Sequence, residues 1–228
     1  MEIEKLLTTV NYSKGSKKEN KYIVIHYVGA TGGAEDNCKY FKDEYRGASA
    51  NYFVGHKGEV YQCVLDTDVA WHCGSTTGYK HKECRNSNSI GIEMCCKKTN
   101  TGSWYFEEDT VNSTIELVKE LMKKYNIPSS NVIRHYDVTG KTCPEPYVRN
   151  PAAWASFKAR LGANTVTTGY LVKIAVDALN VRDGAGITYK INTVVKKNEV
   201  YTIVKESNGW GKLKSGAGWI KLSYTDRV

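Results

Sequence analysis

Apolar residues gather in short, unbroken runs in the first part of the chain. Residues 22–28 are apolar apart from His26, and residues 89–96 are interrupted only by Ser89, Gly91 and Glu93. Runs of about five to eight β-branched and aromatic residues are typical of strands that are buried on both faces of a sheet. The pattern therefore predicts two central strands, at 22–28 and 89–96.

Three other segments repeat apolar residues at the three- and four-residue spacing of a helix, at 34–45, 109–125 and 151–161. Asn150 and Pro151 are a cap and a first helical residue for the last segment, and Gly162 is its stop. A hairpin is predicted around residues 55–58 and a short strand at 131–137. Strands that alternate with helices predict an α/β domain, a mixed central sheet flanked by helices, over residues 1–162.

The pattern changes beyond residue 162. Residues 163–169 are small and polar and are interpreted as a linker, and residues 170–228 show only the two-residue period of strands. Five short strands in about sixty residues predict a small all-β barrel as the second domain. The predicted strands cover residues 171–175, 178–181, 199–204, 210–213 and 219–222.

Charge narrows the range of partners. The 228 residues carry a net charge of +8, of which +5 lies from residue 164 onward. A chain with a net positive charge is expected to bind a polyanionic partner, such as nucleic acid, an anionic membrane or an acidic wall polymer. There is no basic helix, no stacking motif in a basic groove and no apolar run of membrane-spanning length, so we expect no nucleic-acid or membrane partner. We expect a monomer, made in the cytoplasm because the amino-terminal residues lack the apolar core of a secretory signal.

Two histidines and a cysteine suggest chemistry. His26 ends the first predicted strand, His135 follows a later apolar run, and Cys143 lies eight residues further in a loop. Two histidines on strand ends and a nearby thiolate form a ligand set typical of catalytic zinc, with one position left open. The H-E-x-x-H pattern of common metallopeptidases is absent. Spacing alone leaves open the alternative of three unrelated core residues.

Five motifs occur in a fixed order, IVIHYVG, SANYFVGHKGEVYQ, VAWHCG, SIGIEM and VIRHYDVTGKTCP. In this order, over most of residues 20–160, the chain resembles the zinc-dependent N-acetylmuramoyl-L-alanine amidases of the type 2 amidase and peptidoglycan-recognition-protein superfamily. The later motifs ALNVRDGAG, NGWGKL and GWIKL are similar to bacterial SH3-like domains that target cell walls. Together the two parts resemble a phage endolysin or a bacterial autolysin.

The resemblance implies one Zn²⁺ on His26, His135 and Cys143, a catalytic carboxylate at Glu93 and a catalytic lysine at Lys141. The sequence context of Glu93 supports a catalytic role. A carboxylate in an otherwise apolar strand costs free energy to bury, so it is expected there only if it has a role. It can accept and return a proton, while the lysine can stabilise an oxyanion. Considered without the other motifs, Glu93 could instead be an ion-paired carboxylate with no catalytic role. Lys141 could likewise be a solvated loop lysine.

The resemblance also implies substrate contacts at His72, Trp71 and Asn51. His72 is similar to a histidine on the rim of the family's cleft, although a loop histidine stacked on Trp71 is an equal alternative. Asn51 stands where many relatives have histidine. Ala50 stands where some phage members have a catalytic tyrosine, so Glu93 is expected to act as the base.

The expected function is hydrolysis of bacterial peptidoglycan at the amide bond between the lactyl group of N-acetylmuramic acid and L-alanine. Two alternatives stay open. A non-catalytic peptidoglycan-binding protein is less favoured, because such relatives commonly lose the cysteine ligand and Cys143 is present. A cysteine peptidase would use Cys143 or Cys73 as its nucleophile. In either enzyme we expect action at the bacterial cell wall after release from the cell that makes it.

Overall fold

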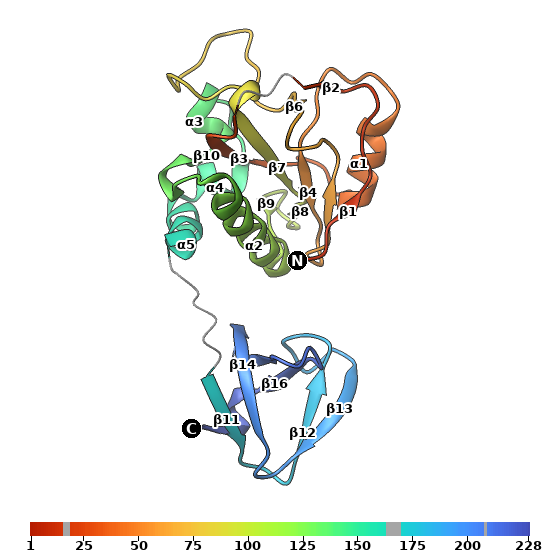
Figure 1. Cartoon of the computed structure of the whole chain (residues 1–228), viewed down its shortest axis with the longest axis vertical. Helices are drawn as coiled ribbons and strands as arrows, with labels where there is room; N and C mark the ends of the chain where they lie inside the picture. Colours follow the sequence, from red (N-terminus) through yellow and green to blue (C-terminus); the bar gives the residue numbers. More distant parts are fainter. Residues whose placement is uncertain (16–18, 163–169, 208) are drawn as a thin grey trace. The chain divides into compact units, whose positions relative to one another are not determined.

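A computed structural model of the chain describes residues 1–15, 19–162, 170–207 and 209–228. The chain divides into two compact units, Met1–Ala163 and Asn164–Val228 (Figure 1). The residues predicted as a linker, 163–169, lie outside the described residues. No helix in the described ranges is both long enough and apolar enough to cross a membrane.

The first unit is built on a six-stranded mixed sheet in the order β1-β5-β4-β7-β3-β10. Its two central strands were predicted from sequence, and β3 pairs in parallel with both β7 and β10. The strands are β1 (Glu4–Lys5), β3 (Tyr22–Tyr27), β4 (Tyr52–Val54), β5 (Val60–Gln62), β7 (Ser89–Met94) and β10 (Val132–Arg134). Nearly every residue of β3 and β7 is buried, so both faces of these strands are covered by other parts of the unit.

Helices cover both faces of this sheet (Figure 1). The long helix α2 and the later α5 pack on one face over the main apolar core, and α1 packs on the other face against β4 and β5. The helices are α1 (Ala34–Lys42), α2 (Glu108–Tyr125), α3 (His135–Thr139), α4 (Glu145–Arg149) and α5 (Pro151–Gly162). The α/β class expected from the strand and helix periods is thereby confirmed.

Alternation along β3 and β7 separates a core face from a polar one. Ile90, Ile92 and Met94 join the core under α2, together with Ile23 and Ile25 of β3. Successive side chains of a strand point to opposite faces, so the residues between them lie on the other side of the sheet. We call this other side the site face, and its members on the two strands are Tyr22, Val24, His26, Ser89, Gly91 and Glu93.

Several short elements differ from the expectation. No strand was predicted before residue 22, yet this part of the chain contains β1 and also β2 (Tyr12–Ser13), which pairs with β6 (Val69–Ala70). Helix α1 ends at Lys42, so the expected extension to Tyr45 is wrong and that side chain is 75% exposed. Two-residue strands have too little length for a periodic signal.

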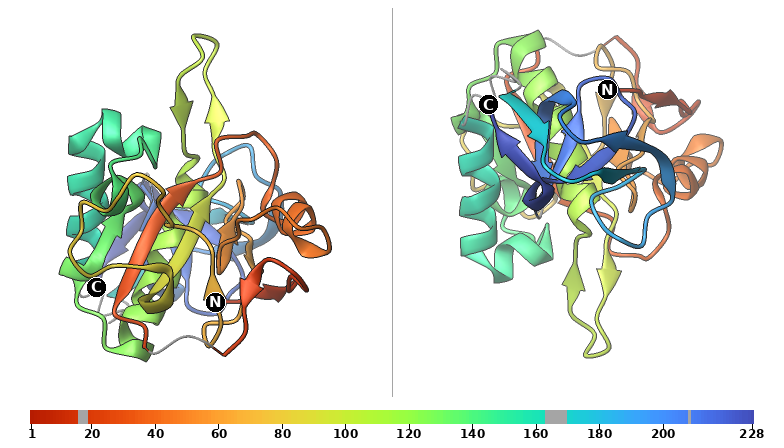
Figure 2. Two further views of the ribbon diagram at one scale, coloured as in Figure 1. Left: turned by 90° about the horizontal axis from the view of Figure 1, so that it is seen from above. Right: turned by 90° about the horizontal axis from the view of Figure 1, so that it is seen from below.

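A hairpin of β8 (Lys97–Lys98) and β9 (Trp104–Tyr105) was also not foreseen, and it projects from its unit in both views of Figure 2. The strand expected at 131–137 stops at Arg134. There the Asp137 carboxylate accepts the backbone N–H of Arg134 at 2.8 Å and starts helix α3. Single-turn 3₁₀ segments lie at η1 (Asn86–Asn88) and η2 (Ser129–Asn131).

The second unit is a seven-stranded antiparallel sheet in the order β13-β12-β16-β15-β14-β11-β17. The five strands expected there are present, and two further strands, β13 and β17, were missed. Most side chains of β13 are exposed, so it carries no apolar alternation. The strands are β11 (Tyr170–Ile174), β12 (Ala178–Arg182), β13 (Ile191–Lys196), β14 (Val200–Ser207), β15 (Trp210–Leu213), β16 (Trp219–Lys221) and β17 (Thr225–Arg227), with the 3₁₀ turn η3 (Leu222–Tyr224).

Candidate active site

The site is anchored by a cross-strand pair at the carboxyl ends of β3 and β7. His26 and Glu93 are register partners on the site face, and the His26 side chain is 1% exposed. Ligand sites in α/β sheets favour the carboxyl ends of parallel strands, where loops leave room above the sheet. Both side chains are therefore held by a rigid sheet whose opposite face is packed core.

His135 and Cys143 reach the same point from the neighbouring strand. β10 lies beside β3, and His135 is the first residue after it. The turn at Gly140, with φ +90°, reverses the chain, and the Tyr136 N–H then donates to the Cys143 carbonyl at 2.8 Å. This closed loop returns the cysteine to the histidine eight residues before it. Both side chains are buried.

One potential metal-ligand atom from each of His26, His135 and Cys143 lies within 4.8 Å of the other two. Cys143 Sγ is 3.7 Å from His26 Nδ1, and the two imidazole ring centroids are 4.7 Å apart. Ligands of one tetrahedral zinc ion lie about 3.5 Å from each other. Two imidazoles and one thiol at this separation fit the donor set of a catalytic zinc site.

Burial decides the protonation of the three side chains. Desolvation lowers the pKa of His26 well below its usual range and lowers the pKa of His135 to about 4, with the nearby Lys141 charge adding to the second effect. Both rings are therefore neutral and each offers a lone pair. Burial also raises the pKa of the Cys143 thiol. A cation is the group that would favour its thiolate form.

The Glu93 carboxylate lies against this cluster. Its Oε1 is 3.9 Å from His26 Nδ1, and its Oε2 is buried with no hydrogen-bond partner among the described residues. Burial raises the pKa of the Glu93 carboxyl to about 8, an effect that the positive charge of Lys141 reduces. A carboxyl group with a pKa in this range can take and release a proton near neutral pH.

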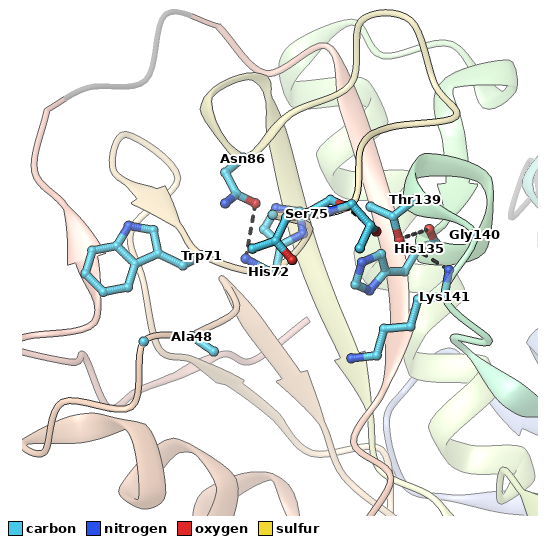
Figure 3. A pocket seen from close by; sticks show the side chains of 13 residues that line it. Ala48, Trp71, His72, Ser75, Asn86, His135, Thr139, Gly140 and Lys141 are labelled. Atoms are coloured by element: carbon cyan, nitrogen blue, oxygen red, sulfur yellow. Dashed lines mark hydrogen bonds between the residues drawn. The ribbon is translucent and has the colours of Figure 1, made fainter.

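A cleft opens over the cluster. It consists of two adjoining hollows, the larger of about 740 Å³, which share Ala48, Trp71, His72, His135 and Lys141. Figure 3 shows the Lys141 side chain reaching past His135 into the larger hollow, with Trp71 at the opposite end. The Trp71 indole N–H donates to Ser13 Oγ at 2.9 Å, which fixes the ring at the cleft wall.

The remaining two expected contact residues occupy different places. His72 lines the cleft but is only 9% exposed, and its ring nitrogens lie 3.0 Å from His26 Nε2 and 3.1 Å from Ser89 Oγ. Asn51 is fully buried in the sheet and lines neither hollow of the cleft. Its amide accepts the Gly91 N–H at 3.0 Å and donates to the carbonyls of residues 64 and 65. The substrate contact expected from Asn51 stays a prediction that this placement does not support.

Sequence reasoning missed Ser89 and Gly91, which lie directly behind the cluster. One signal was present, because a glycine inside an apolar strand often marks the close approach of another group. A Cβ at Gly91 would lie 2.5 Å from Cγ of His72. The glycine therefore makes room for the His72 ring.

Known proteins resemble the first unit in sequence and in structure. A probable N-acetylmuramoyl-L-alanine amidase of Bacillus licheniformis is 33% identical over 164 residues, which cover 64% of this chain and 44% of that protein. The amidase XlyA of Bacillus subtilis is 30% identical over 170 residues, or 73% of this chain and 52% of XlyA. The chain thus spans about half the length of these curated relatives, or less.

Solved structures agree with the sequence matches. A mutant endolysin from Bacillus subtilis superposes with a TM-score of 0.58 at 28% identity, covering 71% of this chain and 99% of that one. The structure of PlyL gives a TM-score of 0.60 at 27% identity over 71% of this chain and 97% of PlyL. Residues 16–146, more than half of the chain, match the Amidase_2 family, which is described as N-acetylmuramoyl-L-alanine amidase. The chain therefore belongs to the Amidase_2 family.

Proposed function

We propose that this protein is a zinc-dependent N-acetylmuramoyl-L-alanine amidase that acts on bacterial peptidoglycan. The bond cut would be the amide between the lactyl group of N-acetylmuramic acid and the L-alanine of the stem peptide. Family membership supports this assignment, and the observation that carries it is the site itself. Two neutral imidazoles and a thiol converge within 4.8 Å, beside a buried carboxylate oxygen that has no hydrogen-bond partner in the described part of the chain.

His26, His135 and Cys143 would hold the metal, and the cleft would leave its open side to the substrate. When bound, Zn²⁺ makes water a stronger nucleophile at neutral pH and polarises the amide carbonyl. Glu93 accepts the proton of the attacking water at Oε2, the atom to which no described residue donates a hydrogen bond. It then gives that proton to the nitrogen of the departing L-alanine, so the carboxylate is regenerated.

Lys141 supports the same step from the cleft wall. Its ammonium group places positive charge in the hollow that His135 also lines, where negative charge develops on the carbonyl oxygen. Lys141 is an exposed residue that lines the cleft, and a positive charge there stabilises an oxyanion that forms close to it. Ala50 is fully buried beside β4 and has no group that can accept a proton, so Glu93 takes the role of base.

Residues 170–228 of the second unit would form an SH3-like domain that holds the enzyme on the bacterial wall. Its surface carries a hollow lined by Arg182, Lys221, Trp210 and Tyr224, with no acidic residue among the lining side chains. Two cationic side chains in this hollow suit a ligand that carries carboxylates. The excess positive charge of this part of the chain supports the same partner.

Product analysis tests the proposed reaction. Purified peptidoglycan is digested with the full chain, and new amino termini and new reducing sugars are measured. We expect new L-alanine amino termini without new reducing ends, loss of the reaction in a strong chelator, and recovery with added Zn²⁺. Activity that survives the chelator but is lost on thiol alkylation would instead identify a cysteine peptidase. Wall binding without any product would identify a recognition protein.

A further inference from the structure

We infer that His72 is a positioning residue that orients His26 through a buried chain of hydrogen bonds. We call this chain the His72 relay, and its members are His26, His72, Ser89 and the carbonyl of Arg85. The inference rests on the proposed function in one respect only, namely that His26 is a metal ligand. It gives His72 a role behind the metal-binding cluster in place of the substrate contact expected from sequence.

The relay is continuous. His26 Nε2 and His72 Nδ1 are 3.0 Å apart, His72 Nε2 and Ser89 Oγ are 3.1 Å apart, and Ser89 Oγ lies 2.7 Å from the Arg85 carbonyl oxygen. The side chains of His26, His72 and Ser89 are all buried. Both ring nitrogens of His72 are therefore already paired inside the protein, and neither is left for a substrate.

The Arg85 carbonyl at the end of the relay determines which atom donates in each hydrogen bond. The Arg85 carbonyl can only accept, so the single hydroxyl proton of Ser89 is donated to it. Ser89 Oγ must then accept from His72 Nε2, which carries the proton of the neutral ring. His72 Nδ1 is left as an acceptor, and it receives the Nε2–H of His26.

This order determines which atom of His26 remains free. With its proton on Nε2, the neutral His26 ring has its lone pair on Nδ1. Nδ1 is the atom that lies 3.7 Å from Cys143 Sγ. The relay thus selects the tautomer whose lone pair faces the Cys143 thiol, and it fixes the ring plane at the same time.

The surroundings of His72 are shaped to hold it in this place. Asn86 Oδ1 accepts the backbone N–H groups of His72 and Cys73 at 3.2 and 2.8 Å, and Figure 3 shows the contact with His72. On the sheet side, the missing side chain of Gly91 leaves the gap that the ring fills. A histidine that served only as a mobile cleft residue would need neither restraint.

The first test measures zinc affinity by competition with a chromogenic chelator. His72→Phe keeps a ring beside Gly91 but removes both ring nitrogens. Ser89→Ala removes the hydroxyl oxygen that accepts a hydrogen bond from His72 Nε2. We expect His72→Phe to weaken zinc binding by about 10- to 100-fold, with a smaller loss for Ser89→Ala. Thr114→Val is the matched control, because it deletes a buried hydroxyl in α2, which donates to the Thr110 carbonyl away from the relay. Unchanged affinity in His72→Phe would overturn the inference.

The second test separates positioning from substrate contact. With zinc at saturating concentration, we expect the KM of His72→Phe for a soluble muropeptide to stay near that of the parent. A raised KM together with parental zinc affinity would assign His72 to substrate binding and contradict the relay.

A third measurement needs no metal. Long-range ¹⁵N spectra of the metal-free chain are expected to show His26 and His72 as Nε2–H tautomers, and Ser89→Ala to perturb the His72 signals. A proton on Nδ1 of His26 would contradict the relay. Because this readout is independent of zinc, a failure of the relay is distinguishable from a failure of the proposed metal centre.

Discussion

The face of β7 that packs under α2 carries Ile90, Ile92 and Met94, whereas its opposite face carries Ser89, Gly91 and Glu93. Both sets come from six consecutive residues, so each site residue has a core residue as its chain neighbour. The core face gains stability by removing apolar surface from water. The site face places polar groups in the same dry interior, which costs free energy unless each group finds a partner. The difference shows how one short strand can supply both rigidity and chemistry.

The polar groups on the site face differ in whether they have a hydrogen-bond partner. Ser89 and His72 satisfy each other within the relay, and the Gly91 N–H is accepted by the Asn51 amide. The Glu93 Oε2 atom has no such partner among the described residues. An unsatisfied buried group of this kind is a reason to look for a missing ligand or a catalytic role. The expected outcomes below are ordered by the size of the effect.

Replacing the cysteine ligand should have the largest effect. Cys143→Ala is expected to remove zinc binding and wall lysis together, because two imidazoles alone form an incomplete site. Metal content and lysis of purified walls measure the two losses. Cys38→Ala is the control, since this thiol is also buried but belongs to helix α1 and packs in a separate apolar cluster. A Cys143→Ala protein that still lyses walls at the parental rate would refute the ligand assignment.

Glu93→Gln should separate chemistry from metal binding. The amide keeps the size of the side chain but is a poor proton acceptor, so turnover is expected to fall by about 10²- to 10⁴-fold. Zinc content should remain at the parental level, because Glu93 is not one of the proposed ligands. Initial rates on a soluble muropeptide, measured beside metal analysis, check both statements. Parental turnover would remove Glu93 from the mechanism.

Ile92→Ala tests the core face of β7, because Ile92 directly precedes Glu93 in the strand but points to the opposite face. Truncating this fully buried side chain is expected to lower the free energy of unfolding by about 2–5 kcal/mol. The zinc content per folded molecule should not change, since Ile92 points away from the site. Urea unfolding of the metal-free chain gives the stability difference. Loss of zinc from protein that is still folded would show that the two faces are not separable.

Removing the second unit should have the smallest effect on chemistry. A fragment of residues 1–163 is expected to cut soluble muropeptide at the rate of the full chain but to bind purified walls less tightly. Co-sedimentation with walls and initial rates on the soluble substrate measure the two properties. Equal wall binding by the fragment would argue against a targeting role for residues 170–228.

The regular elements could be predicted because their patterns are long enough to carry a period. The apolar runs around His26 and Glu93 predicted β3 and β7, and the apolar spacing at 109–125 predicted α2. The family resemblance implied the grouping of His26, His135 and Cys143, which spacing alone left open, and the three side chains do lie together. How these residues act remains a prediction.

The contacts behind the cluster could not be predicted in the same way. His72 lies 46 positions from His26 in a long segment without a clear period, so nothing local indicates that the two rings meet. Helix α3 has five residues, too few for an amphipathic pattern, and it depends on the capping contact of Asp137. Such features are set by tertiary packing. In the sequence, the glycine at position 91 is the signal for the close approach of the His72 ring.

The central claim is that the site face holds one zinc ion, and counting bound metal tests it most directly. The metal-free full chain is dialysed to equilibrium against Zn²⁺, and the bound zinc is measured by atomic absorption, with His26→Ala treated in parallel. One zinc ion per chain in the parent and only background zinc in the variant is the result we predict. A parent that binds no zinc, or a variant that binds as much as the parent, would contradict the account.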